Sequence, residues 1–234
     1  MSQSYFIWNG IDCRSMGVRL RGPVPIVWPE ERVEHIQIPG RSGDLTAVEG
    51  ENIYNSYIQT ATISVLGAYR CRQVKAWLRG SGYVTFSGEP DKRQMARVIG
   101  AVTLNRLSRN LDIWQGEVQF YCQPLKERLR EQTSSVSRGG SLRNNGDVAE
   151  YPLIHLVASA ANVTLQVGGK SLVITGAGNG TALVIDSASQ MVTSGSTSLM
   201  AKTTGYWPVL AVGDTAFGGS GWNAATVERR ERFL

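Results

Sequence analysis

One stretch of the chain, IPGRSGDL at residues 38–45, contains the residue types of a phosphate-binding loop. Glycine-rich loops beside a basic residue can hold phosphates through backbone N–H groups. A P-loop, however, requires G-x-x-x-x-G-K-[ST] between a strand and a helix, whereas this stretch has G-x-x-G, an arginine and no helical periodicity after it. The G-x-G-x-x-G dinucleotide fingerprint is also absent. We therefore predict a tight turn in which Pro39 fixes φ and Gly40 or Gly43 takes a positive φ, with Arg41 as an exposed or inter-subunit charge.

Residues for catalysis or metal binding are few and scattered. The two histidines, His35 and His155, lie far apart, and no CxxC, HxH, HExxH or G-x-S-x-G pattern occurs. Cys13, Cys71 and Cys122 are odd in number and widely spaced, which favours three reduced thiols over a disulfide framework. We predict no catalytic residues, no metal and no cofactor. A carboxylate pair for glycoside hydrolysis stays open as an alternative, although no feature points to one.

Two tryptophans of the second half are candidates for contacts with a sugar ring. Both Trp207 and Trp222 lie in a glycine-rich region of low charge. We expect Trp207 to pack in a core between strand residues. Trp222, within GGSGWNAA, is expected to be exposed in a loop and is the candidate sugar contact.

The composition is that of a folded protein. Of 234 residues, 42% are hydrophobic and 18% charged, and the 26 glycines indicate turn-rich β structure. Residues 1–134 contain 17 basic and 13 acidic residues, against 7 and 6 in residues 135–234. A net charge of +5 spread in this way is a weak signal for nucleic-acid binding. Neither a secretory signal nor an apolar run of membrane-spanning length is visible, so we expect synthesis in a cytoplasm and no membrane partner.

Period-2 alternation of apolar and polar residues predicts strands throughout. One segment instead has a helical pattern, at 71–80, where Val74, Trp77 and Leu78 share a face and Gly80 follows. A polar, charged stretch near 124–134 separates two β domains, which we place at 1–130 and 131–234. The strands are predicted at 61–69, 83–88, 97–107 and 114–122 in the first domain, and at 153–158, 163–167, 171–175, 182–186 and 207–212 in the second. Short strands at close spacing without a helix favour a β-sandwich for the second domain.

Taken in order, several motifs resemble the distal tail proteins (Dit-like) of tailed bacteriophages with long non-contractile tails. The resemblance starts with FIWNGIDCRSMGVRL and continues with IPGRSGDL, the most characteristic motif. Further motifs follow in the order of the family, and together they cover nearly the whole chain: NIYNSYIQTATISV, VKAWLRGSGYVTFSGEPD, VQFYCQP, LRNNGDVAEYPLIHL, LVIDSASQMV, YWPVLAVGDTAF and VERRERFL.

The resemblance implies a structural role. It implies a first domain that is a β-sandwich with one α-helix, related to tail-tube proteins, of which six copies form a ring. It implies a second, galectin-like β-sandwich as a platform for other components. Such a hub joins the tail tube protein to a tail-tip or tail-associated protein at the distal tail of the virion, with receptor-binding proteins as further partners. Genomic DNA passes through the lumen without specific binding.

Two alternatives from other classes stay open at this point. One is a carbohydrate-binding module that contacts the host surface, and the other is a hydrolase of cell-wall polymers.

Overall fold

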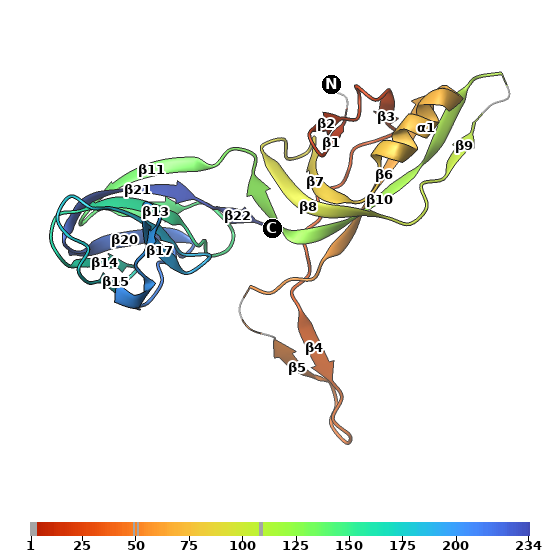
Figure 1. The fold of residues 1–234 in the computed structure, drawn as a ribbon. Helices are drawn as coiled ribbons and strands as arrows, with labels where there is room; N and C mark the ends of the chain where they lie inside the picture. Colours follow the sequence, from red (N-terminus) through yellow and green to blue (C-terminus); the bar gives the residue numbers. More distant parts are fainter. Residues whose placement is uncertain (1–3, 49, 51, 108–109) are drawn as a thin grey trace. The chain divides into compact units, whose positions relative to one another are not determined.

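The computed structural model describes residues 4–48, 50, 52–107 and 110–234 of the chain. They form two compact units, one of residues 1–129 with Leu234 and one of residues 130–233 (Figure 1). The chain is mainly β with one described α-helix, which confirms the predicted fold class. No described helix is long and apolar enough to cross a membrane.

The first unit is built on one curled antiparallel sheet in the order β2-β1-β7-β8-β10-β6-β3, with β9 also paired to β10. Its strands are β1 (Phe6–Trp8), β2 (Ile11–Asp12), β3 (Val18–Leu20), β6 (Tyr57–Leu66), β7 (Ser81–Phe86), β8 (Lys92–Ile99), β9 (Leu104–Arg106) and β10 (Ile113–Arg128). The register between β10 and β8 shifts between Cys122 and Lys126. A β-bulge of this kind bends a strand and increases its twist, which accounts for the curl.

Alternation along the strands separates the two faces of this sheet. On β10, Val118, Phe120 and Cys122 are buried, whereas Glu117 and Gln119 are exposed, as the sequence predicts. The buried face carries an aromatic cluster in which the Phe6 and Trp77 rings stack 5.7 Å apart. One face therefore supplies the core of the unit, and the polar residues gather on the other.

The helix α1 (Ala68–Trp77) covers part of the buried face and packs there through Val74 and Leu78. It begins three residues before the predicted segment. The Ala68 N–H donates to an Asp112 carboxylate oxygen at 3.0 Å, so the acceptor at the helix N-terminus comes from a distant part of the chain. Local sequence does not show this interaction. Gly80 follows the helix with a φ of +77°, in the conformation common just beyond a helix C-terminus.

A hairpin of β4 (Val33–Ile36) and β5 (Leu45–Val48) forms its own two-stranded sheet (Figure 1). The register pairs Val33 with Val48 and Ile36 with Leu45. No other described strand extends this sheet. We call residues 30–48 the hairpin arm.

The second unit is a β-sandwich around one hydrophobic core. One sheet has the order β11-β21-β13-β16-β17-β18, with β11 (Gln132–Ser137), β21 (Trp222–Arg229), β13 (Leu153–Ala158), β16 (Ala182–Asp186), β17 (Met191–Ser194) and β18 (Thr197–Ser198). The other has the order β12-β20-β14-β15-β19, with β12 (Ser141–Asn144), β20 (Gly213–Ser220), β14 (Val163–Val167), β15 (Lys170–Ile174) and β19 (Thr203–Gly205). A 3-10 helix, η1 (Met200–Lys202), and the short β22 (Arg232–Phe233) complete the elements.

Two strand predictions are wrong. The segment 207–212 is not a strand, and only an isolated bridge joins Leu210 to Glu150. The predicted strand 97–107 is divided into β8 and β9 by a break at Gly100, which has a φ of +69°. In both segments, the apolar and β-branched residues that suggested a strand are present, but backbone pairing is interrupted.

The two longest strands of the second unit, β20 and β21, are absent from the sequence prediction because the glycines of β20 and Gly221, which joins the two strands, suggest turns. A side chain at Gly219 would place its Cβ 1.9 Å from the Thr164 carbonyl oxygen, and one at Gly221 would lie 2.1 Å from that of Asn162. Glycine inside a strand often marks such a close backbone approach. Here, glycine brings two strands together instead of ending them.

A buried ion cluster fixes the end of β21. The Arg229 guanidinium bonds Glu150 at 2.6 Å and Glu231 at 3.2 Å, and also donates to the Arg143 carbonyl at 2.7 Å. All three ionic side chains are buried. Buried carboxylates need such a partner, because desolvation makes an unpaired charge costly. This cluster explains Arg229 and Glu231 of the terminal VERRERFL motif, whereas Glu228 and Arg230 pair with His155 and Asp186.

The close approach of β9 to β10 generates a stability prediction. A Cβ at Gly116 would lie 1.9 Å from the Thr103 carbonyl oxygen, so Gly116→Ala should force the two strands apart. We expect a loss of about 2 kcal/mol in unfolding free energy, measured by urea denaturation. Gly88→Ala is the control, because its Cβ would lie 3.4 Å from Ile26. Equal stability of the two variants would contradict the close approach.

Candidate functional site

The turn predicted from IPGRSGDL lies at the tip of the hairpin arm. Gly40 and Gly43 both have a φ of +81°, and Arg41 donates its backbone N–H to the Ile38 carbonyl at 3.2 Å. A Cβ at either glycine would meet no atom within 4 Å, so glycine is needed here for the backbone conformation and not for space. Pro39 and Arg41 are exposed. The geometry is that of a solvent-exposed turn.

The hairpin arm presents apolar side chains to solvent. Ile36 is 40% exposed and Leu45, its cross-strand neighbour, is 43% exposed. Trp28, shortly before the arm, is 80% exposed. A two-stranded hairpin is at best marginally stable alone in water, and exposed apolar surface of this kind marks interaction sites. The arm therefore has the properties of a segment that binds another surface.

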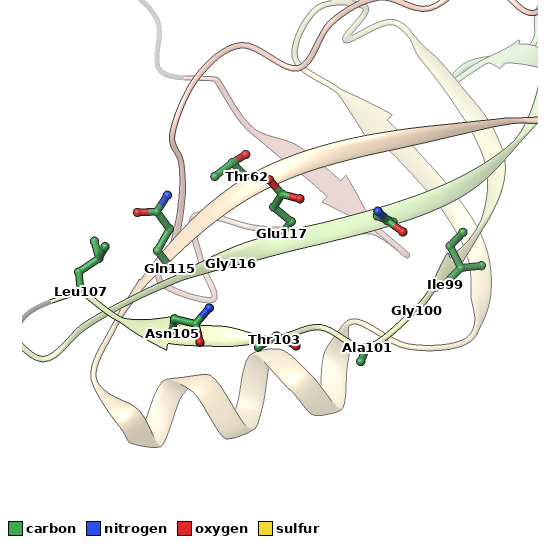
Figure 2. Close-up of a pocket in the computed structure, with 11 residues that line it drawn as sticks. Thr62, Ile99, Gly100, Ala101, Thr103, Asn105, Leu107, Gln115, Gly116 and Glu117 are labelled. Carbon is green, nitrogen blue, oxygen red and sulfur yellow. The ribbon is translucent and has the colours of Figure 1, made fainter.

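A polar groove lies on the sheet face opposite the core (Figure 2). Thr62 of β6 lies directly across from Glu117 of β10 in the register, and both line the groove. Its volume is about 550 Å³, and Glu117 is the one charged residue in the lining. The other lining residues are Ile99, Gly100, Ala101, Thr103, Asn105, Leu107, Gln115, Gly116 and Gln119. Hydroxyl and amide groups thus share this surface with apolar side chains.

A second groove, of about 500 Å³, lies beside α1. Its lining includes Arg72 and Lys75 of α1 and Arg79, which lies two residues beyond the end of the helix. Apolar residues complete the lining, namely Ala76, Leu78, Ala101 and Val102, together with Gly100. No ion pair involves these three cations within the described part of the chain. Like charges three or four residues apart on a helix repel, so this basic groove favours an anionic occupant.

Trp222 is not the exposed residue that the sequence suggested. Its side chain is 0% exposed and lies in the core of the second unit, and its indole N–H donates to the Thr164 carbonyl at 3.2 Å. The indole offers no free face to a sugar ring, so the expected contact is wrong. The physical reason is that Trp222 begins β21 and points inward. Trp207 is half-buried and packs against the same core, as expected.

The histidines and cysteines form no reactive cluster. His155 Nε2 lies 3.0 Å from Glu228 Oε1, and His35 contacts only Thr46 among side chains. The three cysteines are free, and burial raises the pKa of Cys122 to about 12, which keeps its thiol protonated. Within the described ranges, no three residues of the metal-binding types come together.

Sequence reasoning missed both grooves. The groove residues on β6 and β10 are the alternate polar positions of predicted strands, and the helix cations were seen only as the polar side of an amphipathic helix. For the groove beside α1, a signal is present in the sequence: residues 70–79 contain four basic residues and no acidic one.

The fold is shared with a solved structure over its full length. The chain superimposes with a TM-score of 0.75 and 19% identity, over 100% of both chains, on the crystal structure of SPP1 Dit (gp 19.1), described as a paradigm of the hub adsorption apparatus in Gram-positive-infecting phages. A second match, the phage p2 baseplate in its activated conformation with Sr, has a TM-score of 0.40 and 8% identity over 99% of both chains. No family model and no curated protein matches the sequence.

The turn at the arm tip generates a prediction about where Gly43→Val acts. A β-branched residue at a φ of +81° is strained by about 1–2 kcal/mol, but the strain lies in an exposed turn outside both cores. We expect the melting temperature of the monomer to change little, whereas self-association, measured by sedimentation velocity, should weaken.

Arg41→Ala is the matched control for the fold, because it removes an exposed side chain without strain. Its monomer should melt like the wild type. A Gly43→Val protein with unchanged melting and unchanged self-association would contradict the role assigned to this turn.

Proposed function

We propose that this chain is a structural virion protein, a distal tail hub that forms a hexameric ring between tail tube and tail tip, and that it has no enzymatic activity. The full-length likeness to SPP1 Dit, with a TM-score of 0.75, is the observation that carries this proposal. The ordered motifs of the sequence support it independently. The partners in the proposal are the tail tube protein, a tail-tip or tail-associated protein and receptor-binding proteins. The galectin-like second domain serves as their platform.

Ring closure requires two different complementary surfaces on each copy, because a cyclic assembly of more than two copies uses a heterologous interface. The first unit offers such surfaces. Strand β6 pairs with β10 along its full length, but with β3 only from Ile63 to Val65. No described strand pairs with the other edge of β6 at residues 57–61. An open strand edge is available for pairing with another chain.

The polar groove face is the surface that suits the ring lumen. Double-stranded DNA binds proteins chiefly through phosphate contacts with Lys and Arg. The groove on β6 and β10 contains hydroxyls, amides and one carboxylate, Glu117. The groove lining itself provides no cation for the phosphates, so it does not hold DNA; Arg19 and Arg97 lie on the same sheet face outside this lining. We place this face toward the lumen.

The ring itself is tested by the mass of the assembled protein. We expect six copies by native mass spectrometry and six-fold rings in negative-stain images, with the tail tube and tail-tip partners added if the chain alone does not assemble. If the protein stays monomeric in the presence of these partners, the proposal of a ring-forming hub is refuted.

The lumen assignment is tested by adding cations to the groove. Gln115→Arg with Gln119→Arg should convert a passive wall into a phosphate-binding one, so the assembled ring should retain double-stranded DNA at about 50 mM salt and release it near 200 mM. The measurement is fluorescence anisotropy with labelled DNA, and the wild-type ring should bind weakly at both salt concentrations.

The matched control places two arginines on the second unit, at Ser135 and Thr226, which form a cross-strand pair. Equal DNA retention by the groove variant and this control would count against the lumen assignment.

A further inference from the structure

We infer that the hairpin arm of one copy binds the basic groove beside α1 of a neighbouring copy, and that this contact holds adjacent subunits together. The inference rests on the proposed ring, and it names the surfaces that join its subunits. Within the described part of one chain, no ion pair involves the charged residues of either surface.

The arm is acidic. Residues 30–48 contain four acidic residues and two arginines, a net charge of −2 with His35 neutral. Glu30, Glu31, Glu34 and Asp44 lie within the described part of the chain, where no ion pair involves them. They are exposed. An exposed acidic segment with unpaired carboxylates is suited to a basic partner.

The α1 groove has the opposite charge. Residues 70–79 contain four basic and no acidic residues. Arg72, Lys75 and Arg79 are exposed in the lining of the groove. The arm therefore carries a net charge of −2 and the groove lining a charge of +3, and complementary potentials of this kind fix the partner and the register of an interface.

The apolar residues match as well. In the hairpin register, Glu34 and Ala47 share a face with Ile36 and Leu45, because residues two apart on a strand point the same way. This face combines a carboxylate with two exposed apolar side chains. The groove combines its cations with a floor that includes Ala76, Leu78 and Val102. Burial of Ile36 and Leu45 there would provide the apolar contact that a two-stranded hairpin lacks by itself.

A second copy of the chain is the occupant that fits these features. A ring requires two different surfaces on each subunit, and arm and groove are such a pair. DNA would satisfy the cations of the groove, but it would leave both its apolar floor and the acidic arm without a partner. The groove combines cations with apolar residues, which suits a mixed apolar and acidic peptide surface.

Two charge reversals test the contact. The groove variant is Arg72→Glu with Lys75→Glu, and the arm variant is Glu31→Lys with Glu34→Lys. Each variant alone places like charges at every interface, so we expect it to need at least about tenfold more protein to assemble than the wild type. An equimolar mixture should assemble again, because alternating copies pair a normal arm with a normal groove and a reversed arm with a reversed groove. A ring of six accommodates three of each.

The fraction of assembled protein is measured by mass photometry, at the lowest concentration at which the wild type assembles. The tail partners are added if the wild type needs them. The control is Arg138→Glu with Lys202→Glu, two exposed cations of the second unit without a described ion pair, and it should assemble like the wild type. If the groove reversal unfolds the monomer, Arg72→Gln with Lys75→Gln replaces it and should also weaken assembly, and raising the salt concentration should weaken the wild type.

The possible results separate this inference from the hub proposal. Normal rings from both single reversals, or a mixture that stays monomeric while each variant is folded, would overturn the arm contact and leave the hub intact. If the groove variant loses DNA binding but assembles normally, DNA is the occupant of the groove, and the arm contact is overturned in this case too. A wild-type chain that never assembles would refute both.

Discussion

The sheet of the first unit has two faces, and the core and α1 cover only one of them. Strand β10 makes the consequence plain, since Val118 and Phe120 are buried while Glu117 and Gln119 remain in solvent. The open face carries polar residues beside a few exposed apolar ones, such as Ile58 and Tyr121, and antiparallel sheets tolerate one solvated face. The groove, its near-neutral chemistry and the proposed lumen all follow from this asymmetry.

The hairpin arm is a second region of the first unit that one copy of the chain leaves uncovered. Its turn has the backbone geometry that glycine permits, and its strands expose Ile36 and Leu45, which one copy leaves in solvent. Surface left apolar and acidic in a single chain is explained if another copy covers it. The arm and the α1 groove then become two halves of one interface. In the proposed ring, the open edge of β6 would be a further site for contact between copies.

Sequence patterns predicted the elements whose residues are determined locally. β13, β14 and β16 were predicted at their observed bounds, because alternation and flanking turns define them. The strands β20 and β21 were missed, since Gly219 in β20 and Gly221 between the two strands allow close approach to Thr164 and Asn162, which only the folded chain brings near. The start of α1 depends on Asp112 in the same way. Trp222 was misplaced because a glycine-rich neighbourhood looks like a loop, whereas tertiary pairing makes it a strand. Prediction of the two grooves requires the register between strands, which the order of residues along the chain does not contain.

The central claim is that copies of this chain surround a lumen lined by the polar groove. A cryo-electron microscopy reconstruction of the assembled protein tests it most directly, because it locates Thr62 and Glu117 relative to the symmetry axis. The account predicts a closed ring with these two side chains facing the axis. A closed ring with Glu117 on its outer surface, or an assembly without a central channel, would contradict it.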